Sequence, residues 1–521
     1  EFTLREVNRK TRKKRRRTSE DNSAPKKGGR KPFHIILIVI YMILMICFSA
    51  MLIWLNVLPM KYLIPALAVI LIGSFFVVMF LRIRKKRSKR RVVGTVIAII
   101  AIIVYGIGSY YIYSTQDLFS KISTIGQSTE DYYVIVPAED VEDASAKAMG
   151  LDLIMGDDVY VFKSSETPYL EARQKLADHV QINFEEGKNS IEISETLMNG
   201  DCNAIFMSST YYDMSCENIK GFEEATKIIY TITIATAVDN VAKSVDRITT
   251  TPFNVCISGN DNFGTIEQVA KSDVNMVMTV NPETKTILLT SIPRDSYVML
   301  HSRAAYDKLT HSGVYGVDET VTTIEDMLSI DINYYIRVNF STVIEIVDAI
   351  GGIDVKSDMA FITHGRQNEG YSFVEGKNHL SGEEALAFSR ERYSFTDGDF
   401  QRNKNQQKVL KAMLKKVLSS KTLLTKYTQL LDAVKDEMQT NMTTSEMQSL
   451  VKMQINDMSG WNIANYSITG STGSQPCYTM GGAPASVVIP STSCITKANT
   501  KINNVMNGAE QADGEWTRDY E

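Results

Sequence analysis

The chain has 521 residues, 44% of them hydrophobic and 22% charged, which is enough for two or three domains with apolar cores. Its charge is uneven: residues 1–32 carry 13 Lys and Arg against 4 Asp and Glu, whereas residues 115–521 carry 34 basic and 56 acidic side chains. This acidic excess excludes a nucleic-acid partner for most of the chain, because it would repel the phosphates.

Three apolar stretches follow the basic arm 1–32 and predict transmembrane helices at 33–58, 62–81 and 92–113. Each is long enough to cross a hydrocarbon core of about 30 Å. The basic arm and the basic loop 82–91 are expected in the cytoplasm, which places everything after residue 114 outside the cell. A buried helical hairpin with one anchor is the alternative, and a basic arm that binds nucleic acid is a weaker one.

Residues 130–240 predict a small extracellular α/β accessory domain. Runs of β-branched and aromatic residues at 132–136, 159–162 and 203–207 alternate with helical stretches, and a helical or mixed region reaches Ala237. The sequence there contains no phosphate loop, nucleophile elbow or metal-ligand spacing. An accessory or interaction role is therefore favoured over a second active site.

A second domain is expected to start near residue 251 and to end near residue 470. Residues 274–280 and 285–292 form two strand-like runs around an Asn-Pro-Glu-Thr turn, a hairpin signal. Antiparallel pairing would bring Asp273 to Arg294 and Asp295 at the open end. The alternative is an ordinary salt bridge at a strand end.

Two helices of this domain have recognisable ends. Ser341 is a candidate cap for a helix that runs to Ala349, where a Gly-Gly pair stops it. Ser381 and Glu384 form a capping box that starts a short helix. That helix is expected to run through Phe388, with Arg390 and Arg392 after it.

Four arginines, Arg294, Arg390, Arg392 and Arg402, stand close to acidic residues in this domain. Guanidinium groups bind phosphate in a bidentate manner, so the set indicates phosphate chemistry. Arg402 and Gln406 are four residues apart, on one face at the start of a helix whose apolar stripe continues to Val417. Ordinary solvated charge is the alternative interpretation.

These motifs, taken together, resemble the LytR-CpsA-Psr family. Five segments between residues 251 and 418 carry the resemblance in order: Lys271-Ser272-Asp273, Ser291-Ile292-Pro293-Arg294-Asp295, the residues VDAIGGI at 347–353, LSGEEALAFSRER at 380–392 and GDFQR at 398–402. Three membrane helices followed by an accessory domain resemble the capsule-associated members of Gram-positive bacteria.

The resemblance implies an αβα sandwich with a mixed central sheet that binds a polyprenyl-pyrophosphate-linked glycan. Family members are thought to be Mg²⁺-dependent enzymes that transfer the glycan phosphate to peptidoglycan outside the membrane. Membrane lipid and capsule-biosynthesis proteins are further expected partners. The alternatives are a membrane-bound regulator that binds the lipid-linked precursor and a pyrophosphatase that uses water as acceptor.

By the same resemblance, Asp273 and Asp295 are expected to hold Mg²⁺, and pyrophosphate to be bound by Arg294, Arg390, Arg392, Arg402, Gln406 and Lys271. Arg294, Arg390, Asp273 and Asp295 are the expected catalytic residues. Two positions depart from the family pattern. Asn405 stands where an Arg often precedes the Gln. Lys271 stands where Arg is usual; it keeps the charge but not the forked guanidinium, which puts its role in doubt. Either Asp273 or Asp295 could accept the proton of the acceptor hydroxyl.

The cysteines and the end of the chain complete the expectations. Cys477 and Cys494 flank a segment rich in Gly, Ser and Pro, so a disulfide between them is predicted, with Cys202 and Cys216 as a weaker pair. Residues 471–521 are predicted to be a Gly/Ser/Pro-rich and acidic tail.

Overall fold

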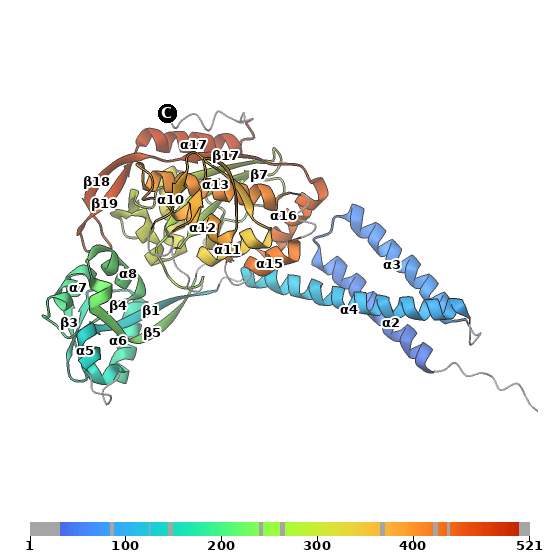
Figure 1. Ribbon diagram of the computed structural model, residues 1–521, viewed down its shortest axis with the longest axis horizontal. Coiled ribbons are helices and arrows are strands. Elements are labelled where there is room, and N and C mark those ends of the chain that lie inside the picture. Colours follow the sequence, from blue (N-terminus) through green and yellow to red (C-terminus); the bar gives the residue numbers. More distant parts are fainter. Residues whose placement is uncertain are drawn as a thin grey trace, which may run out of the picture. The chain divides into compact units, whose positions relative to one another are not determined.

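The computed structural model describes nine stretches of the chain (Figure 1): residues 32–83, 88–123, 126–143, 150–238, 243–260, 266–364, 370–419, 426–434 and 438–509. Nearly all of the basic arm 1–32, and the end of the predicted acidic tail, lie outside these residues. The chain divides into two compact units, Glu1–Tyr113 and Ser114–Glu521.

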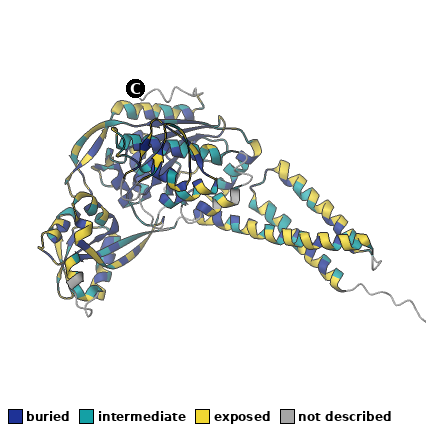
Figure 2. Ribbon diagram, in the orientation of Figure 1, coloured by how far each residue is buried: buried dark blue, intermediate teal, exposed yellow. Residues whose placement is uncertain are grey.

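Three long helices dominate the first unit: α2 (Pro32–Leu55), α3 (Met60–Leu81) and α4 (Lys89–Ser123). Each is long and apolar enough to cross a membrane, which confirms the three predicted spans. Many of their apolar residues are exposed (Figure 2), as expected of surfaces that contact lipid. α4 extends beyond the predicted end at residue 113, so the expected polar stalk starts as a helix.

The accessory domain (residues 127–237) contains a five-stranded mixed sheet in the order β3-β2-β4-β1-β5. β1 pairs antiparallel with β4 and β5, and β2 runs parallel to β3 and β4. The strands are β1 (Gln127–Pro137), β2 (Asp158–Phe162), β3 (Asn183–Gly187), β4 (Ala204–Ser208) and β5 (Thr226–Ala237). The helices are α5 (Ala138–Asp143), η1 (Gly150–Ile154), α6 (Thr167–His179), α7 (Ser190–Met198), α8 (Ser209–Asn218) and α9 (Phe222–Ala225).

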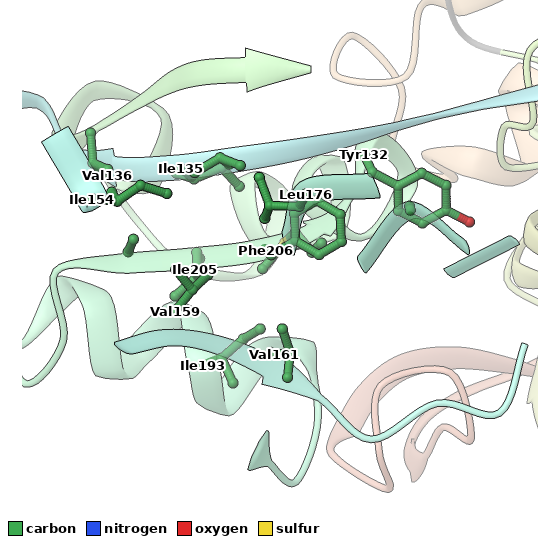
Figure 3. Packing of buried hydrophobic residues seen from close by; sticks show 14 of the residues in the cluster. Tyr132, Ile135, Val136, Ile154, Val159, Val161, Leu176, Ile193, Ile205 and Phe206 are labelled. Carbon is green, nitrogen blue, oxygen red and sulfur yellow. The ribbon is translucent and has the colours of Figure 1, made fainter. Parts of the chain in front are cut away.

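An apolar core fixes this domain. Phe206 and Ile205 of β4 are completely buried and pack with Val159 of β2, Leu176 of α6 and Ile193 of α7 (Figure 3). Such close-packed cores supply most of the free energy that offsets chain entropy. The expected helical or mixed region before Ala237 ends in a strand instead, because residues 226–237 alternate β-branched and polar side chains along β1.

The main domain (residues 253–506) is built on a six-stranded mixed sheet in the order β16-β11-β6-β7-β8-β17. β6 is parallel to β11, β8 is parallel to β17, and β7 pairs antiparallel with both β6 and β8. The strands are β6 (Phe253–Gly259), β7 (Val274–Asn281), β8 (Thr286–Ile292), β11 (Tyr334–Val338), β16 (Met438–Thr440) and β17 (Asn462–Ser467).

Helices cover both faces of this sheet, which confirms the predicted αβα sandwich. α10 (Val317–Leu328) and α17 (Thr492–Met506) contribute Ile324 and Ile502 to the core on one face. α13 (Asp399–Val417) and α16 (Thr444–Asp457) pack Leu410 and Met447 on the other. Continuous apolar strands buried on both faces are the expected pattern for such a sheet.

Smaller elements surround the sheet. A third apolar cluster joins α11, α12 and α13 to the β12–β15 pair. The remaining elements are β9 (Tyr297–Leu300), β10 (Ala305–Lys308), η2 (Leu309–Tyr315), α11 (Phe340–Ala349), β12 (Ile353–Ser357), β13 (Phe361–Ile362), β14 (Ser372–Phe373), β15 (Gly376–Leu380), α12 (Gly382–Arg390), α15 (Tyr427–Val434), β18 (Gly470–Pro476) and β19 (Pro484–Pro490).

Local predictions about the ends of helices are partly confirmed. The capping box of Ser381 and Glu384 starts α12, and α11 ends at Ala349 before two glycines with positive φ. The cap of α11 is Asn339, not Ser341. Its side-chain oxygen accepts a hydrogen bond from the backbone N–H of Thr342, and the backbone N–H of Asn339 donates to the Thr342 hydroxyl. Asn at this position satisfies the first free N–H groups of the helix.

The main domain also continues past residue 470, where the sequence analysis ended it. β18 and β19 pair as a hairpin, and α17 buries Ala498, Ile502 and Val505 against the sheet. Apolar residues of α17 recur with helical spacing inside a segment whose composition is otherwise polar, so composition alone hid the helix.

Neither predicted disulfide is present, because all six cysteines are free thiols. Cys477 lies buried in an apolar cluster with Met214 and Met480. Cys494 lies in the first turn of α17, with its sulfur 3.4 Å from the Thr469 hydroxyl. The Gly-rich segment is held instead by the ladder of β18 and β19 and does not need a covalent link.

Candidate anion-binding site

Charged residues gather where the strands of the main sheet end. β6 ends at Gly259, β8 ends at Ile292 just before Arg294 and Asp295, and Asp273 immediately precedes β7. The backbone N–H of Asp273 donates to the Gly259 carbonyl at 2.8 Å, which ties it to this edge. Ligands of open α/β sheets bind in the same place, outside the carboxyl ends of the parallel strands.

The predicted meeting of Asp273 and Arg294 is confirmed. Nη1 of Arg294 lies 2.7 Å from Oδ1 of Asp273, and the Thr310 hydroxyl donates to the same oxygen at 3.1 Å. Burial raises the pKa of Asp273, but Arg294 and Lys271 outweigh it and hold that pKa well below its usual range. Asp273 therefore stays ionised and Arg294 stays fixed at the strand ends.

Asp295 forms a second ion pair beside the first. Its carboxylate lies 3.0 Å from Nζ of Lys308 and 3.8 Å from Nε of Arg294. Burial raises the pKa of Asp295, whereas Lys308 and Arg294 lower it further than burial raises it. Lys308 was missed by the sequence analysis, because only the fold of the β9–β10 hairpin brings it to Asp295.

Arg402 and Arg392 lie on either side of Asp399, at the beginning of α13. Nη2 of Arg402 is 3.1 Å, and Nη1 of Arg392 3.7 Å, from Oδ1 of Asp399. Arg402 is only 8% exposed, yet its Nε and Nη2 have no hydrogen-bond partner among the described residues. Burial and then repulsion from Arg294 lower the pKa of Arg402.

A buried guanidinium with unused donors is costly unless a ligand accepts from it. The start of a helix adds further N–H donors and the positive end of a dipole. Besides burial, Arg294 and Arg392 lower the pKa of Arg402 and Asp399 and Asp273 raise it, so these groups lie within electrostatic reach of one another. These cations therefore lie together at one edge of the sheet and are a candidate site for an anion.

Two further predicted residues lie on α12 and α13. Arg390 ends α12 with its guanidinium 4.2 Å from the centre of the Phe340 ring, a cation–π contact. Gln406 is half-buried on α13. Its neighbour Gln407 is fully buried and donates to the carbonyls of Leu289 and Tyr466, so it anchors α13 to β8 and β17.

Lys271 is bound by the accessory domain. Its Nζ lies 2.5 Å from Oε1 of Glu217 in α8, and the lysine is 8% exposed. Burial lowers the pKa of Lys271, but Asp273 and Glu217 raise it more, so the ammonium stays charged. Partial burial of the carboxyl of Asp213, one turn before Glu217, raises its pKa to about 6. No sequence signal pointed to either acidic residue.

Two amides complete the edge. Asn260 follows β6, is 3% exposed, and has neither side-chain atom hydrogen-bonded within the described part of the chain. Asn405 on α13 is 1% exposed, and its Nδ2 likewise lacks a partner there. The position of Asn260 directly after a buried strand is the signal that could have found it.

The donor set suits Mg²⁺ bound together with a phosphate. Mg²⁺ usually takes one or two carboxylates, several waters and substrate phosphate oxygens. Asp273 and Asp295 supply two carboxylates held ionised by their neighbours. Among the described residues there is no group of three or more His, Cys, Asp or Glu that could hold a metal alone.

Known proteins are similar in sequence to this part of the chain. The family model of the LytR_cpsA_psr family matches residues 183–485. A Bacillus anthracis (strain CDC 684 / NRRL 3495) protein named polyisoprenyl-teichoic acid--peptidoglycan teichoic acid transferase TagU is 37% identical over 214 residues, 41% of this chain and 67% of the relative. A protein of the same name from Enterococcus faecalis (strain ATCC 700802 / V583) is 37% identical over 202 residues, 38% of this chain and 64% of the relative.

Among solved structures, B. subtilis TagV has 27% identity and a TM-score of 0.42, covering 50% of this chain and 98% of that one. TagT bound to LI-WTA has 26% identity and a TM-score of 0.40, covering 51% and 94%. The family model covers more than half of the chain, including every predicted site residue. The chain belongs to the LytR_cpsA_psr family.

Proposed function

We propose that this chain is a membrane-anchored transferase that moves a glycopolymer phosphate from a polyprenyl-pyrophosphate carrier to peptidoglycan. The names of the relatives describe such a transfer for teichoic acid. The glycopolymer of this chain is a teichoic-acid-like or capsular polymer. Three apolar helices serve as the anchor, with the basic N-terminal arm in the cytoplasm and residues 114–521 outside.

One observation carries the proposal: beside the Arg294–Asp273 pair lies the buried guanidinium of Arg402, whose Nε has no hydrogen-bond partner among the described residues and whose Nη2 has only the ion pair with Asp399. A pyrophosphate would accept from these donors and replace the missing hydrogen bonds. Arg392, at the other side of Asp399, would share its charge, and Arg390 and Gln406 would contact the phosphates from α12 and α13. Lys271 would join them by leaving Glu217.

In the proposed reaction, the oxygen of a peptidoglycan hydroxyl attacks the phosphorus that carries the glycan. A new phosphodiester bond forms, the bond to the bridging oxygen of the pyrophosphate breaks, and polyprenyl phosphate leaves with the bonding electron pair. The hydroxyl proton passes to a carboxylate, either Asp273 or Asp295. Such transfers depend on positioning and on charge neutralisation, which the arginines supply.

Asp273 and Asp295 would hold Mg²⁺, which would neutralise pyrophosphate charge when bound. Both carboxylates keep a lowered pKa, so they are ionised at neutral pH as metal binding requires. Arg294 lies between them and fixes their positions.

The test uses the full chain in lipid nanodiscs with a polyprenyl-pyrophosphate glycan, Mg²⁺ and peptidoglycan. Wild type should attach the glycan covalently, and Asp273→Ala and Arg390→Ala should each reduce the rate by about 100-fold or more. Arg173→Ala, in a partly exposed ion pair of the accessory domain, is the control and should keep full activity.

Three results would contradict the proposal. Binding of the lipid-linked glycan without transfer or release would identify a precursor-binding regulator. Release of free glycan phosphate with water as acceptor would identify a pyrophosphatase. Transfer that survives both substitutions would place the chemistry away from this edge of the sheet.

A further inference from the structure

The hairpin of β9 and β10 presents four side chains on one face. Tyr297 pairs with Lys308 and Met299 with Tyr306 across the antiparallel ladder, and paired residues share a face. Val298, Leu300 and Asp307 point to the opposite face and are buried. The hairpin is therefore anchored on one side, and its other side carries two tyrosines, a methionine and a lysine.

Much of this face is exposed although it is apolar. Tyr306 is 50% exposed and Met299 48%. The Tyr306 ring stacks on Tyr297, with ring centres 5.1 Å apart and an angle of 24° between the planes. Tyr297 is itself fixed, because its hydroxyl donates to the Pro476 carbonyl at 2.9 Å. Tyr306 therefore has a rigid support and a ring that remains open to solvent.

The same face leads directly to the anion-binding site. Lys308 follows Tyr306 by two residues and pairs with Asp295 at 3.0 Å, next to Arg294. Residues two apart in a strand are about 6.5–7 Å apart on one face. In a lipid-linked glycan the first sugar is bonded directly to the pyrophosphate. A sugar ring next to a phosphate at this edge would therefore reach Tyr306.

We propose that Tyr306, supported by Tyr297 and flanked by Met299, binds the first sugar ring of the lipid-linked donor. Pyranose rings have a C–H face that packs on aromatic rings, while their hydroxyls remain available to water. The inference rests on the proposed function and adds to it the contact that recognises the glycan. An exposed apolar patch beside a charged site is typical of ligand binding.

A structural role for the stack is the competing explanation, since cross-strand aromatic contacts stabilise hairpins. The two roles differ in what they require of a ligand. A sugar contact affects only ligands that carry the sugar, whereas loss of hairpin stability would move Lys308 and weaken every pyrophosphate ligand.

The experiment measures dissociation constants of the full chain in detergent for two probes: polyprenyl pyrophosphate, and the same lipid bearing one N-acetylglucosamine. We expect Tyr306→Ala to weaken the sugar-bearing probe by about three- to tenfold. Tyr306→Ala should leave the sugar-free probe unchanged, and Tyr306→Phe should behave as wild type. Met299→Ala should have a smaller effect in the same direction. Met155→Ala, at a methionine of the accessory domain that is 62% exposed, should have none.

Each other result overturns the inference. Equal weakening of both probes would assign the stack to hairpin stability, and no weakening would leave the ring without a role in binding the donor. Normal donor binding with a raised KM for peptidoglycan would assign this face to the acceptor. If wild type bound neither probe, the proposed function itself would fail; binding of both with equal affinity would remove only the sugar contact.

Discussion

The accessory and main domains are both helix-covered mixed sheets, but they treat buried charge differently. Among the described residues, the fully buried polar side chains of the accessory domain are uncharged Ser and Thr. Within its described ranges, the main domain buries seven carboxylate, ammonium or guanidinium groups: Lys271, Asp273, Asp307, Glu319, Arg337, Glu391 and Arg402. An unpaired buried charge is costly. The accessory domain therefore has the interior of a structural core, and the main domain has that of a candidate site.

Not every buried charge in the main domain is functional. Asp307 pairs with His311 and accepts from the Thr479 backbone, and Glu391 accepts from the backbones of His364 and Ser394. These carboxylates are satisfied by the fold. Arg402 differs because, in the described structure, its Nε has no hydrogen-bond partner and its Nη2 has only an ion pair with the half-buried Asp399. Incomplete satisfaction, rather than burial alone, identifies the site.

The largest effect is expected from Arg294→Ala. It would leave Asp273 buried without its main partner, which destabilises a protein by about 3–5 kcal/mol. It would also remove the central cation, which should lower transfer about 100- to 1000-fold. Thermal unfolding and the transfer assay would measure the two effects.

A matched control separates these effects by using the accessory domain. Phe206→Ala removes a fully buried ring from that core and should lower the free energy of unfolding by about 3–5 kcal/mol. At a temperature where the variant is folded, it should still transfer glycan. If both variants lost transfer equally, the loss would follow from lower stability and not from the missing arginine. That result would contradict the contrast between a structural core and a site.

Arg402→Met tests whether an incompletely bonded charge is kept for function. The substitution keeps the apolar stem but removes a buried cation that is only partly paired. We expect transfer to fall about 100-fold while Tm stays the same or rises. A fall in Tm of more than about 5 °C would show that Arg402 stabilises the fold.

Asp273→Asn should make the stability of the protein depend less on pH under acidic conditions. The folded pKa of Asp273 lies below its unfolded value because Arg294 and Lys271 overcome the effect of burial, which raises it. The ionised carboxylate therefore contributes stability above the unfolded pKa of about 4, and this stability is lost as pH falls through the folded pKa. Between pH 5 and pH 3, Tm should fall less in the variant than in wild type; parallel curves would refute the lowered pKa.

The smallest effect is expected from Glu217→Gln, where the accessory domain touches the site. Removing this carboxylate frees Lys271 and makes the edge more positive. Because Glu217 is 55% exposed, its pairing is worth little, and affinity for inorganic pyrophosphate should rise about two- to fivefold. Calorimetry on the full chain would measure it, with Glu171→Gln in α6 as control. Weaker binding would mean that Glu217 positions Lys271 for the ligand.

Local sequence signals predicted much of this architecture. The three apolar stretches gave the membrane helices, because length and hydropathy alone satisfy that requirement. The Asn-Pro-Glu-Thr turn between two β-branched runs set the register that joins Asp273 to Arg294. The capping box of Ser381 was likewise a purely local signal. In each case neighbouring residues contain all the necessary information.

Other features depended on contacts between distant segments. The disulfides inferred from Cys477 and Cys494 failed because spacing does not determine whether two sulfurs meet. α17 was hidden because its few apolar residues matter only when the sheet is beside them. The β5 strand was recognised only once β1 was available to pair with it.

The sequence by itself determined that phosphate chemistry belongs to this chain, since four arginines in family motifs indicate it wherever they fold. Only the tertiary structure decided which groups share the site. It brought Lys308 to Asp295 and Glu217 to Lys271, pairs that no local pattern predicts. It also left Nε of Arg402 without a hydrogen-bond partner among the described residues, because hydrogen-bond satisfaction is a property of the packed fold and not of residue order.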